Sequence, residues 1–197
     1  MRTTILILCL VLAWIPVRLS KQDAGTREKV LTPEQKVYQQ ALKLASADRQ
    51  RLRAQAKKAF DAEMAREKAG DCPNARSTYE TNNCLNNEFG ITDENYKTYV
   101  EAVQALLSLK GPPPPGQEVH AVQSGPAGPE LTPEQHTAEF DHLEAVWKPY
   151  SDAVCTATFH QYGGGTAGPP AEGECGLRMT RQHMRDLDQV YYGPLHL

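Results

Sequence analysis

The chain has 197 residues, enough for one domain of ordinary size with extensions, and its 21 Lys and Arg against 24 Asp and Glu give a net charge of −3. The charge is unevenly divided, because residues 21–70 carry a net charge of +5 and residues 71–197 carry −10. An acidic region of this kind repels nucleic acid and attracts basic partners, so we exclude nucleic acid as a partner, although solubility alone would also explain the charge.

Residues 1–20 are predicted to be a signal peptide. Arg2 precedes an apolar run from Ile5 to Val17, which is short for a bilayer span and has the length of a signal-peptide core. Arg18 would occupy the third position before the expected cleavage point, which is unfavourable, so an uncleaved N-terminal anchor is the alternative. In either case we expect an exported protein of the periplasm or the extracellular space.

The next segment, residues 21–70, is predicted to be an Ala-rich, charged helical extension. A helix is expected from about Pro33 to Lys68, with Thr32 as N-cap, Gln35 completing a capping box, and Gly70 ending it. The helix has few large apolar residues, so it should bury little and either lie on the rest of the chain or extend as a stalk. As an arm it could contact an anionic polymer or lipid of the cell envelope.

A cysteine-bearing segment follows this helix. Ser77 and Glu80 have the spacing of a capping box, so a short helix is expected to start near Thr78. The five residues after Cys72 would then form a loop that lets this cysteine fold back towards Cys84. One continuous helix would instead hold the two cysteines about 18 Å apart, beyond the reach of a disulfide.

Three further helices are expected beyond this segment, separated by two loops. The first lies within residues 91–110 and ends at a linker or insertion rich in Pro and Gly, residues 111–130. The second follows Thr132, with a kink or break at Pro149. A loop from Gly163 to Gly173 precedes the third, which starts after Cys175. Residues at spacings of three and four are expected to face inward: Tyr96, Tyr99, Val100, Val103, Leu106 and Leu107; Phe140, Leu143, Trp147, Tyr150 and Val154; and Leu177, Met184, Leu187 and Tyr191.

No strand pattern is found, so the predicted fold is all-α: a small helical bundle over residues 71–192, stapled by two disulfides and preceded by the long Ala-rich helix. In an exported chain, cysteines are expected to form disulfide bonds, and four cysteines follow the predicted signal peptide: Cys72, Cys84, Cys155 and Cys175. Three pairings are possible, and the sequence alone does not choose among them. Pairing of Cys72 with Cys84 and of Cys155 with Cys175, in which each bridge closes a short loop, is favoured.

Catalytic and metal chemistry are disfavoured on the same residues. A thiol protease would need Cys155 as a thiolate beside a histidine base, but no known nucleophile motif surrounds it. A zinc site would lack the close ligand pair that structural zinc sites usually have. The candidate zinc ligands are Cys155, His160, Cys175 and His183. If they bind no metal, the two histidines are predicted to lie on the surface. Carboxylate pairs such as Glu172 with Glu174 are expected to form a solvated face. We therefore expect no metal, no cofactor and no enzymatic activity.

The cysteine segments resemble the secreted bacterial domain of the LprI-type lysozyme inhibitors over about residues 71–190. The first motif of that domain is matched by Cys72, Ala75, Ser77 or Thr78, Glu80, Asn82 and Cys84. Its second motif is matched by Trp147, Tyr150, Asp152 and Cys155, then by Gly164, Gly165 and Thr166, and finally by Cys175, Thr180 and Arg181. Two positions depart from the pattern, because Ser151 and His183 stand where the family commonly has arginine.

This resemblance implies a small, disulfide-linked, all-α domain and, for some members, inhibition of lysozyme. The matched residues are expected to be structural, with Trp147 and Tyr150 in the core and the glycines in a turn, whereas Asp152 has no assigned role. We therefore expect a non-enzymatic binding protein whose partner is a basic protein such as lysozyme. The alternatives are a structural or interaction module attached to the envelope through residues 21–70, and a hydrolase of cell-wall glycan, which would need two carboxylates about a cleft.

Overall fold

The computed structural model describes residues 31–116 and 131–192 and contains four α-helices. These are α1 (Pro33–Ala69), α2 (Thr78–Ser108), α3 (Pro133–His160) and α4 (Gly168–Leu187), and a π-helical turn, η1 (Asp188–Tyr192), directly follows α4. The described residues include no strand, and the all-α prediction is confirmed. The predicted signal peptide and most of the predicted linker lie outside the described residues.

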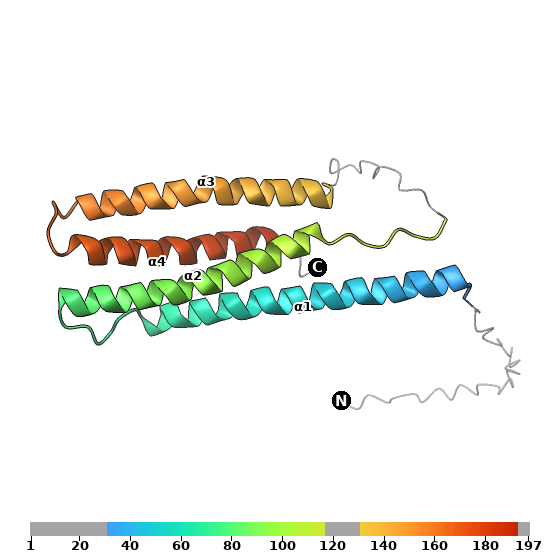
Figure 1. The fold of residues 1–197 in the computed structure, drawn as a ribbon, viewed down its shortest axis with the longest axis horizontal. Helices are drawn as coiled ribbons and strands as arrows, with labels where there is room; N and C mark the ends of the chain where they lie inside the picture. Colours follow the sequence, from blue (N-terminus) through green and yellow to red (C-terminus); the bar gives the residue numbers. More distant parts are fainter. Residues whose placement is uncertain (1–30, 117–130, 193–197) are drawn as a thin grey trace, which may run out of the picture. The chain divides into compact units, whose positions relative to one another are not determined.

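Consecutive helices run in opposite directions along the bundle. Figure 1 shows α4 between α3 and α2, with α1 against the opposite side of α2. Helix α2 packs against each of the other three helices, so it is the central element. None of the helices in the described part combines the length and hydropathy that a bilayer span requires.

The start and end of α1 follow the sequence signals closely. Thr32 accepts a hydrogen bond from the Gln35 backbone, and the Gln35 side chain accepts one from the Thr32 backbone, so the predicted capping box is present. Gly70 ends the helix with a φ of 84°, a left-handed value that favours glycine. The same capping box starts α3 at Thr132.

The two halves of α1 differ in burial. The first half is largely exposed, and Val37 and Leu44 keep 69% and 62% of their surface. In the second half, Ala56 and Ala59 belong to the hydrophobic core. These alanines let α1 approach α2 closely, because small side chains hold the helix axes near each other. The domain boundary at residue 70 stays a prediction, but this half of α1 packs as part of the bundle.

Helix α2 differs from the prediction, because one continuous helix replaces the two expected ones. Gly90 lies in its interior and does not interrupt it. Leu85 and Thr92, on either side of this glycine, are both buried, and the Thr92 hydroxyl donates to Glu63 of α1. Tertiary contacts on both sides thus offset the intrinsic cost of a helical glycine, about 1 kcal/mol relative to alanine.

Helix α3 continues through Pro149, so the break expected at this proline does not occur. Its inward face is also displaced from the predicted one. Phe140 is fully buried, but Leu143 and Tyr150 are 42% and 61% exposed, and the core role predicted for Tyr150 is wrong. Ser151 and Cys155 take the inner positions instead, because the disulfide draws this part of α3 onto α4.

Helix α4 begins earlier than predicted, at Gly168 instead of after Cys175. Proline is compatible with a first helical turn, where its missing N–H leaves no bond unmade, so the Pro-rich segment starts the helix. The turn before it is confirmed at Gly163 and Gly164, whose φ values are 57° and 79°. The predicted inward residues of α4 and η1, Leu177, Met184, Leu187 and Tyr191, are all buried.

Both disulfides favoured from the sequence are present. Cys72 is bonded to Cys84 at the junction of α1 and α2, and Cys155 is bonded to Cys175 between α3 and α4. Each bridge joins segments that are consecutive in the chain. The bridges therefore fix the two helical hairpins, while noncovalent contacts between the described helices, including the bond from Arg181 of α4 to Glu63 of α1, hold one hairpin against the other.

Candidate functional site

A groove lies over α4, between α2 and α3, with a volume of about 560 Å³. Its walls mix aromatic, amide, hydroxyl and charged side chains. Helix α2 contributes Asn82, Leu85, Asn86 and Phe89; α3 contributes Trp147, Lys148, Ser151, Asp152, Cys155 and Thr156; and α4 contributes Pro169, Glu172, Gly173, Gly176 and Thr180. This size is within the range of about 300–1,000 Å³ that is typical of small-molecule sites.

Two glycines of α4 give the groove its floor. A Cβ atom at Gly176 would lie 2.7 Å from Cε2 of Phe89, and one at Gly173 would lie 3.4 Å from Cδ1 of Leu85. Helices α2 and α4 therefore approach more closely here than larger residues would allow. The Cys155–Cys175 bridge fixes α3 to the same part of α4, so three helices hold the groove in shape.

The groove contains polar side chains without an internal partner. Ser151 and Thr180 are only 6% and 8% exposed, and neither hydroxyl forms a hydrogen bond within the described part of the chain. Their oxygen atoms are not sealed off, so they are accessible from the groove. The side-chain amides of Asn82 and Asn86 likewise form no hydrogen bond with the described residues.

The charges at the groove are mostly balanced. Lys148 donates to Asp152 at 2.7 Å, one turn along α3, and both side chains are exposed. Asp152, which had no role in the sequence analysis, thus forms a surface ion pair on the rim. Glu172 makes no ion pair within the described residues, so the groove carries one uncompensated carboxylate.

A ring cluster lies behind Trp147. The Trp147 and His183 rings stack with centroids 4.1 Å apart and planes 4° apart. His183 Nε2 lies 2.8 Å from a Glu144 carboxylate oxygen, and the Tyr96 hydroxyl donates to the other oxygen. His183 is only 8% exposed, so its predicted surface position is wrong. Burial, followed by the hydrogen bond and charge of Glu144, raises the pKa of Tyr96 above its usual range.

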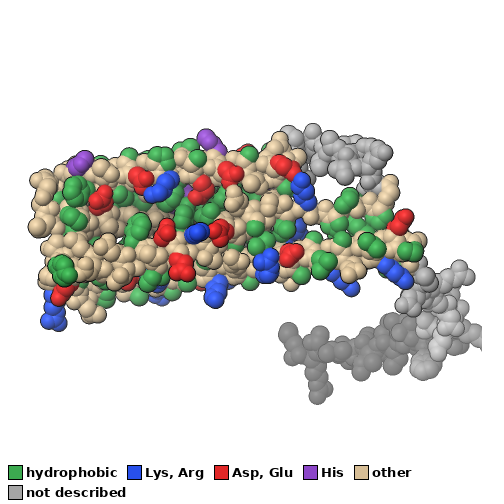
Figure 2. Space-filling view, viewed as in Figure 1, with side chains coloured by type: hydrophobic (Ala, Val, Ile, Leu, Met, Phe, Trp, Pro, Cys, Tyr) green, Lys and Arg blue, Asp and Glu red, His purple; other side chains and the backbone are tan. Residues whose placement is uncertain are grey.

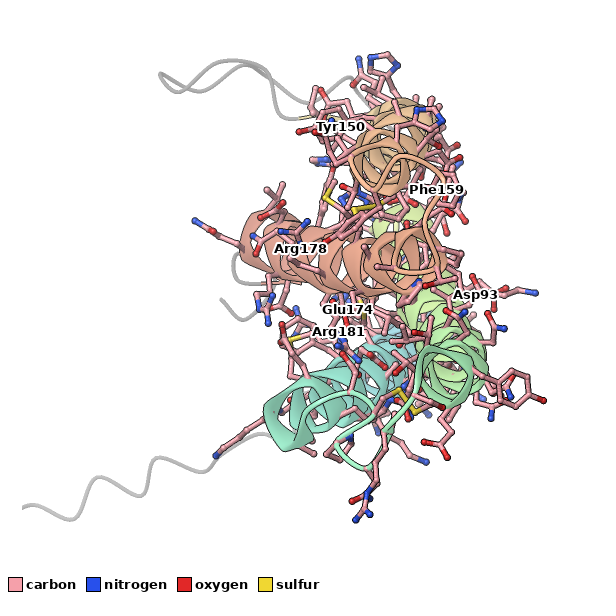
Figure 3. The ribbon with its side chains drawn as sticks, turned by 90° about the vertical axis from the view of Figure 1, so that its left-hand side faces the viewer. Asp93, Tyr150, Phe159, Glu174, Arg178 and Arg181 are labelled. Carbon is pink, nitrogen blue, oxygen red and sulfur yellow. A yellow bond between two sulfur atoms is a disulfide. The ribbon has the colours of Figure 1, made fainter. Side chains whose placement is uncertain are left out.

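A buried ionic network joins α1, α2 and α4 on the other side of the bundle. Glu63 is fully buried and accepts hydrogen bonds from Thr92 at 2.7 Å, Asn95 at 2.8 Å and Arg181 Nε at 2.8 Å. Arg181 also donates to both carboxylate oxygens of Asp71. Figure 3 shows Arg181 directed from α4 towards α1.

The network determines the charge state of Glu63. Burial by itself raises the pKa of this carboxyl, but the hydrogen bonds from Asn95, Thr92 and Arg181 and the charge of Arg181 outweigh it. The resulting pKa lies below the ordinary value of a glutamate carboxyl, so Glu63 is ionised at neutral pH. Although Arg181 belongs to the motif of the resemblance, no sequence pattern indicates that its partner is a carboxylate of α1.

The sequence-derived motif residues divide between the groove and the helix ends. Those that line the groove are Asn82, Trp147, Asp152, Cys155 and Thr180. Glu80 takes part in the start of α2, where its carboxylate accepts a hydrogen bond from the Arg76 backbone, and Gly164, Gly165 and Thr166 belong to the turn between α3 and α4. Cys72 and Cys84 form the other bridge. The thiol and zinc chemistries considered for Cys155 are excluded, because its sulfur is bonded to Cys175.

The comparisons with known proteins agree with the extent of the disulfide-linked region. The family model described as "Lysozyme inhibitor LprI" matches residues 70–187, more than half of the chain. The match includes both disulfides, α2, α3, α4 and the whole groove. No significant match is found among curated proteins or solved structures.

Proposed function

The chain belongs to the LprI lysozyme inhibitor family, and from this membership we propose that it is an exported, non-enzymatic protein that binds and inhibits lysozyme. The observation that carries the proposal is the family match over residues 70–187, which spans the disulfide-bonded helices. The disulfides are consistent with a protein of the periplasm or the extracellular space, because such bonds persist in oxidising compartments.

The charge distribution supports a basic partner. Residues 71–197 carry a net charge of −10, and several of their cations are already bound to carboxylates. These cations are Lys110, Lys148, Arg181 and Arg185. Figure 2 shows many of the Lys and Arg side chains along the lower edge of the molecule, and Asp and Glu side chains distributed over the whole face. The uncompensated carboxylates would attract a basic protein.

Exposed carboxylates of this kind act mainly on the rate of association. Glu94 and Glu101 of α2 and Glu139 of α3 are exposed and make no ion pair with the described residues. Animal-type lysozymes are strongly basic, so such carboxylates would speed the encounter and orient the two proteins. Inhibition would then follow from occlusion of the lysozyme cleft and needs no chemistry on the inhibitor.

A lysis assay tests the proposal. The oxidised full chain is added at micromolar concentration to a basic lysozyme, and the clearing of a bacterial suspension is followed at low salt. We expect slower clearing that weakens as salt is raised, because salt screens exposed charges beyond about 10 Å at 0.1 M. Unchanged clearing at low salt refutes inhibition.

Charge-neutral variants test the electrostatic part separately. We expect the combined Glu94→Gln, Glu101→Gln and Glu139→Gln variant to inhibit roughly 5-fold less at low salt and to lose most of its salt dependence. The control is Glu34→Gln with Asp48→Asn, which removes two exposed carboxylates from the first half of α1, one of them paired with Arg51. Equal loss of inhibition per charge removed would mean that the position of the acidic charge is irrelevant.

An envelope module without inhibitory activity is the second candidate, and it is favoured by the exposed first half of α1. Residues 21–50 carry six basic and four acidic side chains, a net charge of +2, and Val37 and Leu44 are exposed, as in an arm toward an anionic surface. Deletion of residues 21–50 separates the candidates while leaving Leu52, Ala56 and the rest of the packed half in place. If the deletion variant no longer associates with the envelope but still inhibits lysozyme, the protein has both roles. If the variant loses envelope association and the full chain does not inhibit lysozyme either, the protein is an envelope module alone.

A further inference from the structure

The groove over α4 contains polar groups that an empty structural crevice does not need. Ser151 and Thr180 are more than nine-tenths buried, yet both hydroxyls face the groove without an internal hydrogen bond. Because these oxygen atoms are accessible from the groove, they are free to hydrogen-bond with a ligand that enters it. The amides of Asn82 and Asn86 add donors and acceptors beside them. The groove is therefore suited to a ligand with many hydrogen-bonding groups of both kinds.

The charges of the groove disfavour an ionic ligand. Lys148 is bound to Asp152 on the rim, so no uncompensated cation within the lining is available for a phosphate or carboxylate. Glu172 is one uncompensated acceptor, which suits a hydroxyl or amide donor. A lipid is disfavoured as well, because hydroxyl and amide groups occupy the floor and one wall.

The groove also has two aromatic walls. Trp147 on α3 and Phe89 on α2 both line it, and the stacked His183 ring holds Trp147 in place from behind. Aromatic side chains provide rigid apolar area at low conformational cost. A ligand that fits this lining has apolar C–H faces together with hydroxyl and amide edges.

We propose that this groove binds a neutral, N-acetylated saccharide chain. Its pyranose faces would contact Trp147 and Phe89, its hydroxyls would pair with Ser151, Thr180 and Glu172, and its acetamido groups would pair with the asparagine amides. A peptide fits less well, because the walls are helices whose backbone groups bond internally and offer no edge for a strand. The disulfide and the close approach at Gly176 pre-organise the site, which lowers the cost of binding.

This binding does not depend on the proposed inhibition of lysozyme. The lining that recognises the saccharide is side-chain chemistry of α2, α3 and α4, whereas docking on a basic protein would rely on exposed carboxylates. The two activities are measured in different mixtures, because saccharide binding needs no lysozyme. Failure of either one leaves the other standing.

The test is a titration of the oxidised full chain with the β-1,4-linked trimer of N-acetylglucosamine, followed by NMR through the Asn side-chain amide and Trp147 indole signals. We expect saturable shifts of these signals with a Kd below about 1 mM. Cellotriose, which has the same linkage without acetamido groups, should bind at least about 3-fold more weakly. Absence of shifts at about 10 mM trimer overturns the proposal.

Neighbouring residues of α2 and α4 supply matched variants. Asn86→Ala and Glu172→Gln change the groove, whereas Asn87→Ala and Glu174→Gln make the same changes at exposed positions outside it. We expect roughly 3- to 10-fold weaker trimer binding for the groove variants and less than about 2-fold change for the controls. Equal binding by all four variants, equal binding of cellotriose, or preferred binding of a capped neutral peptide at these signals overturns the saccharide assignment.

Discussion

Replacing Arg181 by methionine tests how the buried network holds α1 to the rest of the bundle. The substitution keeps an unbranched side chain that replaces the stem of arginine from Cβ to Nε, but it removes the guanidinium that is bonded to Glu63 and Asp71. Glu63 then remains fully buried as a carboxylate with two neutral donors and the nearby guanidinium of Arg66. Because the Glu63 environment is sealed from water, the loss cannot be compensated by hydration.

The magnitude follows from the remaining partners. Breaking a buried ion pair by removing one partner costs about 3–5 kcal/mol. Thr92 and Asn95 still donate to Glu63, and Arg66 Nε lies 3.3 Å from it, so the lower end of that range applies. Asp71 is partly exposed and can be hydrated, so it adds little. We expect a loss of about 3 kcal/mol, a large part of a domain stability of roughly 5–15 kcal/mol.

The assay is urea unfolding of the oxidised protein, followed by circular dichroism at 222 nm. Arg178→Met is the matched control, because Arg178 lies on the same helix, is exposed, and forms no ion pair with the described residues (Figure 3). It should change the free energy of unfolding by less than about 0.5 kcal/mol. Equal changes in the two variants, or a loss below about 1 kcal/mol for Arg181→Met, would refute the reasoning.

A double variant separates a pair interaction from simple loss of packing. Glu63→Gln with Arg181→Met removes both charges, so no uncompensated ion is left in the core. We expect its destabilisation to be smaller than the sum for the single variants by about 1–3 kcal/mol. Additive losses would mean that the two residues contribute independently.

Three further predictions concern stability. The pKa of Glu63 is lower in the folded protein than the value of about 4.5 in the unfolded chain, so ionised Glu63 stabilises the fold above pH 4.5, and this stabilisation is lost as the pH falls through the folded pKa. In a variant without this carboxyl, the free energy of unfolding should therefore depend less steeply on pH in the acid range, and an unchanged dependence counts against the reasoning. Gly90→Ala should raise the free energy of unfolding by about 0.5–1 kcal/mol, since a Cβ there meets nothing within 4 Å. Gly176→Ala should lower it by about 1–3 kcal/mol, because a Cβ there would lie 2.7 Å from the Phe89 ring. A higher urea midpoint for Gly176→Ala than for Gly90→Ala contradicts this. Replacing Cys155 and Cys175 by serine should cost about 3 kcal/mol by the same measurement, and a loss near zero would show that the loop entropy of the bridge is unimportant.

The comparison between sequence and structure is clearest at the helix termini and the cysteines. The capping signals at Thr32, Thr132 and Gly70 place their helix boundaries correctly, because a cap is a contact between residues a few positions apart. The favoured disulfides are also local, with separations of 12 and 20 residues. Local information therefore suffices for the caps, and it favours the observed disulfide pairing among the three that are possible.

Two features could be decided only from the tertiary structure: whether a helix continues through a glycine, and which side of a helix faces the core. Gly90 in α2 lies between two helices that the sequence predicts as separate, and Gly173 in α4 ends the predicted loop; glycine has low helix propensity. Both lie inside helices because interhelical contacts offset that propensity: Thr92, near Gly90, bonds to Glu63 of α1, and Gly173 packs against Leu85 of α2. Tyr150 was assigned to the core from its spacing in α3, yet the spacing alone does not say which residue of a stripe faces α4.

By itself, the sequence determined the helices with strong caps and the all-α class, and it favoured the disulfide pairing and the family resemblance that were later confirmed. Only the tertiary structure decided that Glu63 of the Ala-rich helix pairs with Arg181, 118 residues away. It also decided that Asn82, Trp147 and Thr180 meet in one groove. The physical reason is that caps and short loops depend on neighbours in the chain, whereas buried ion pairs and grooves depend on which helix faces pack together.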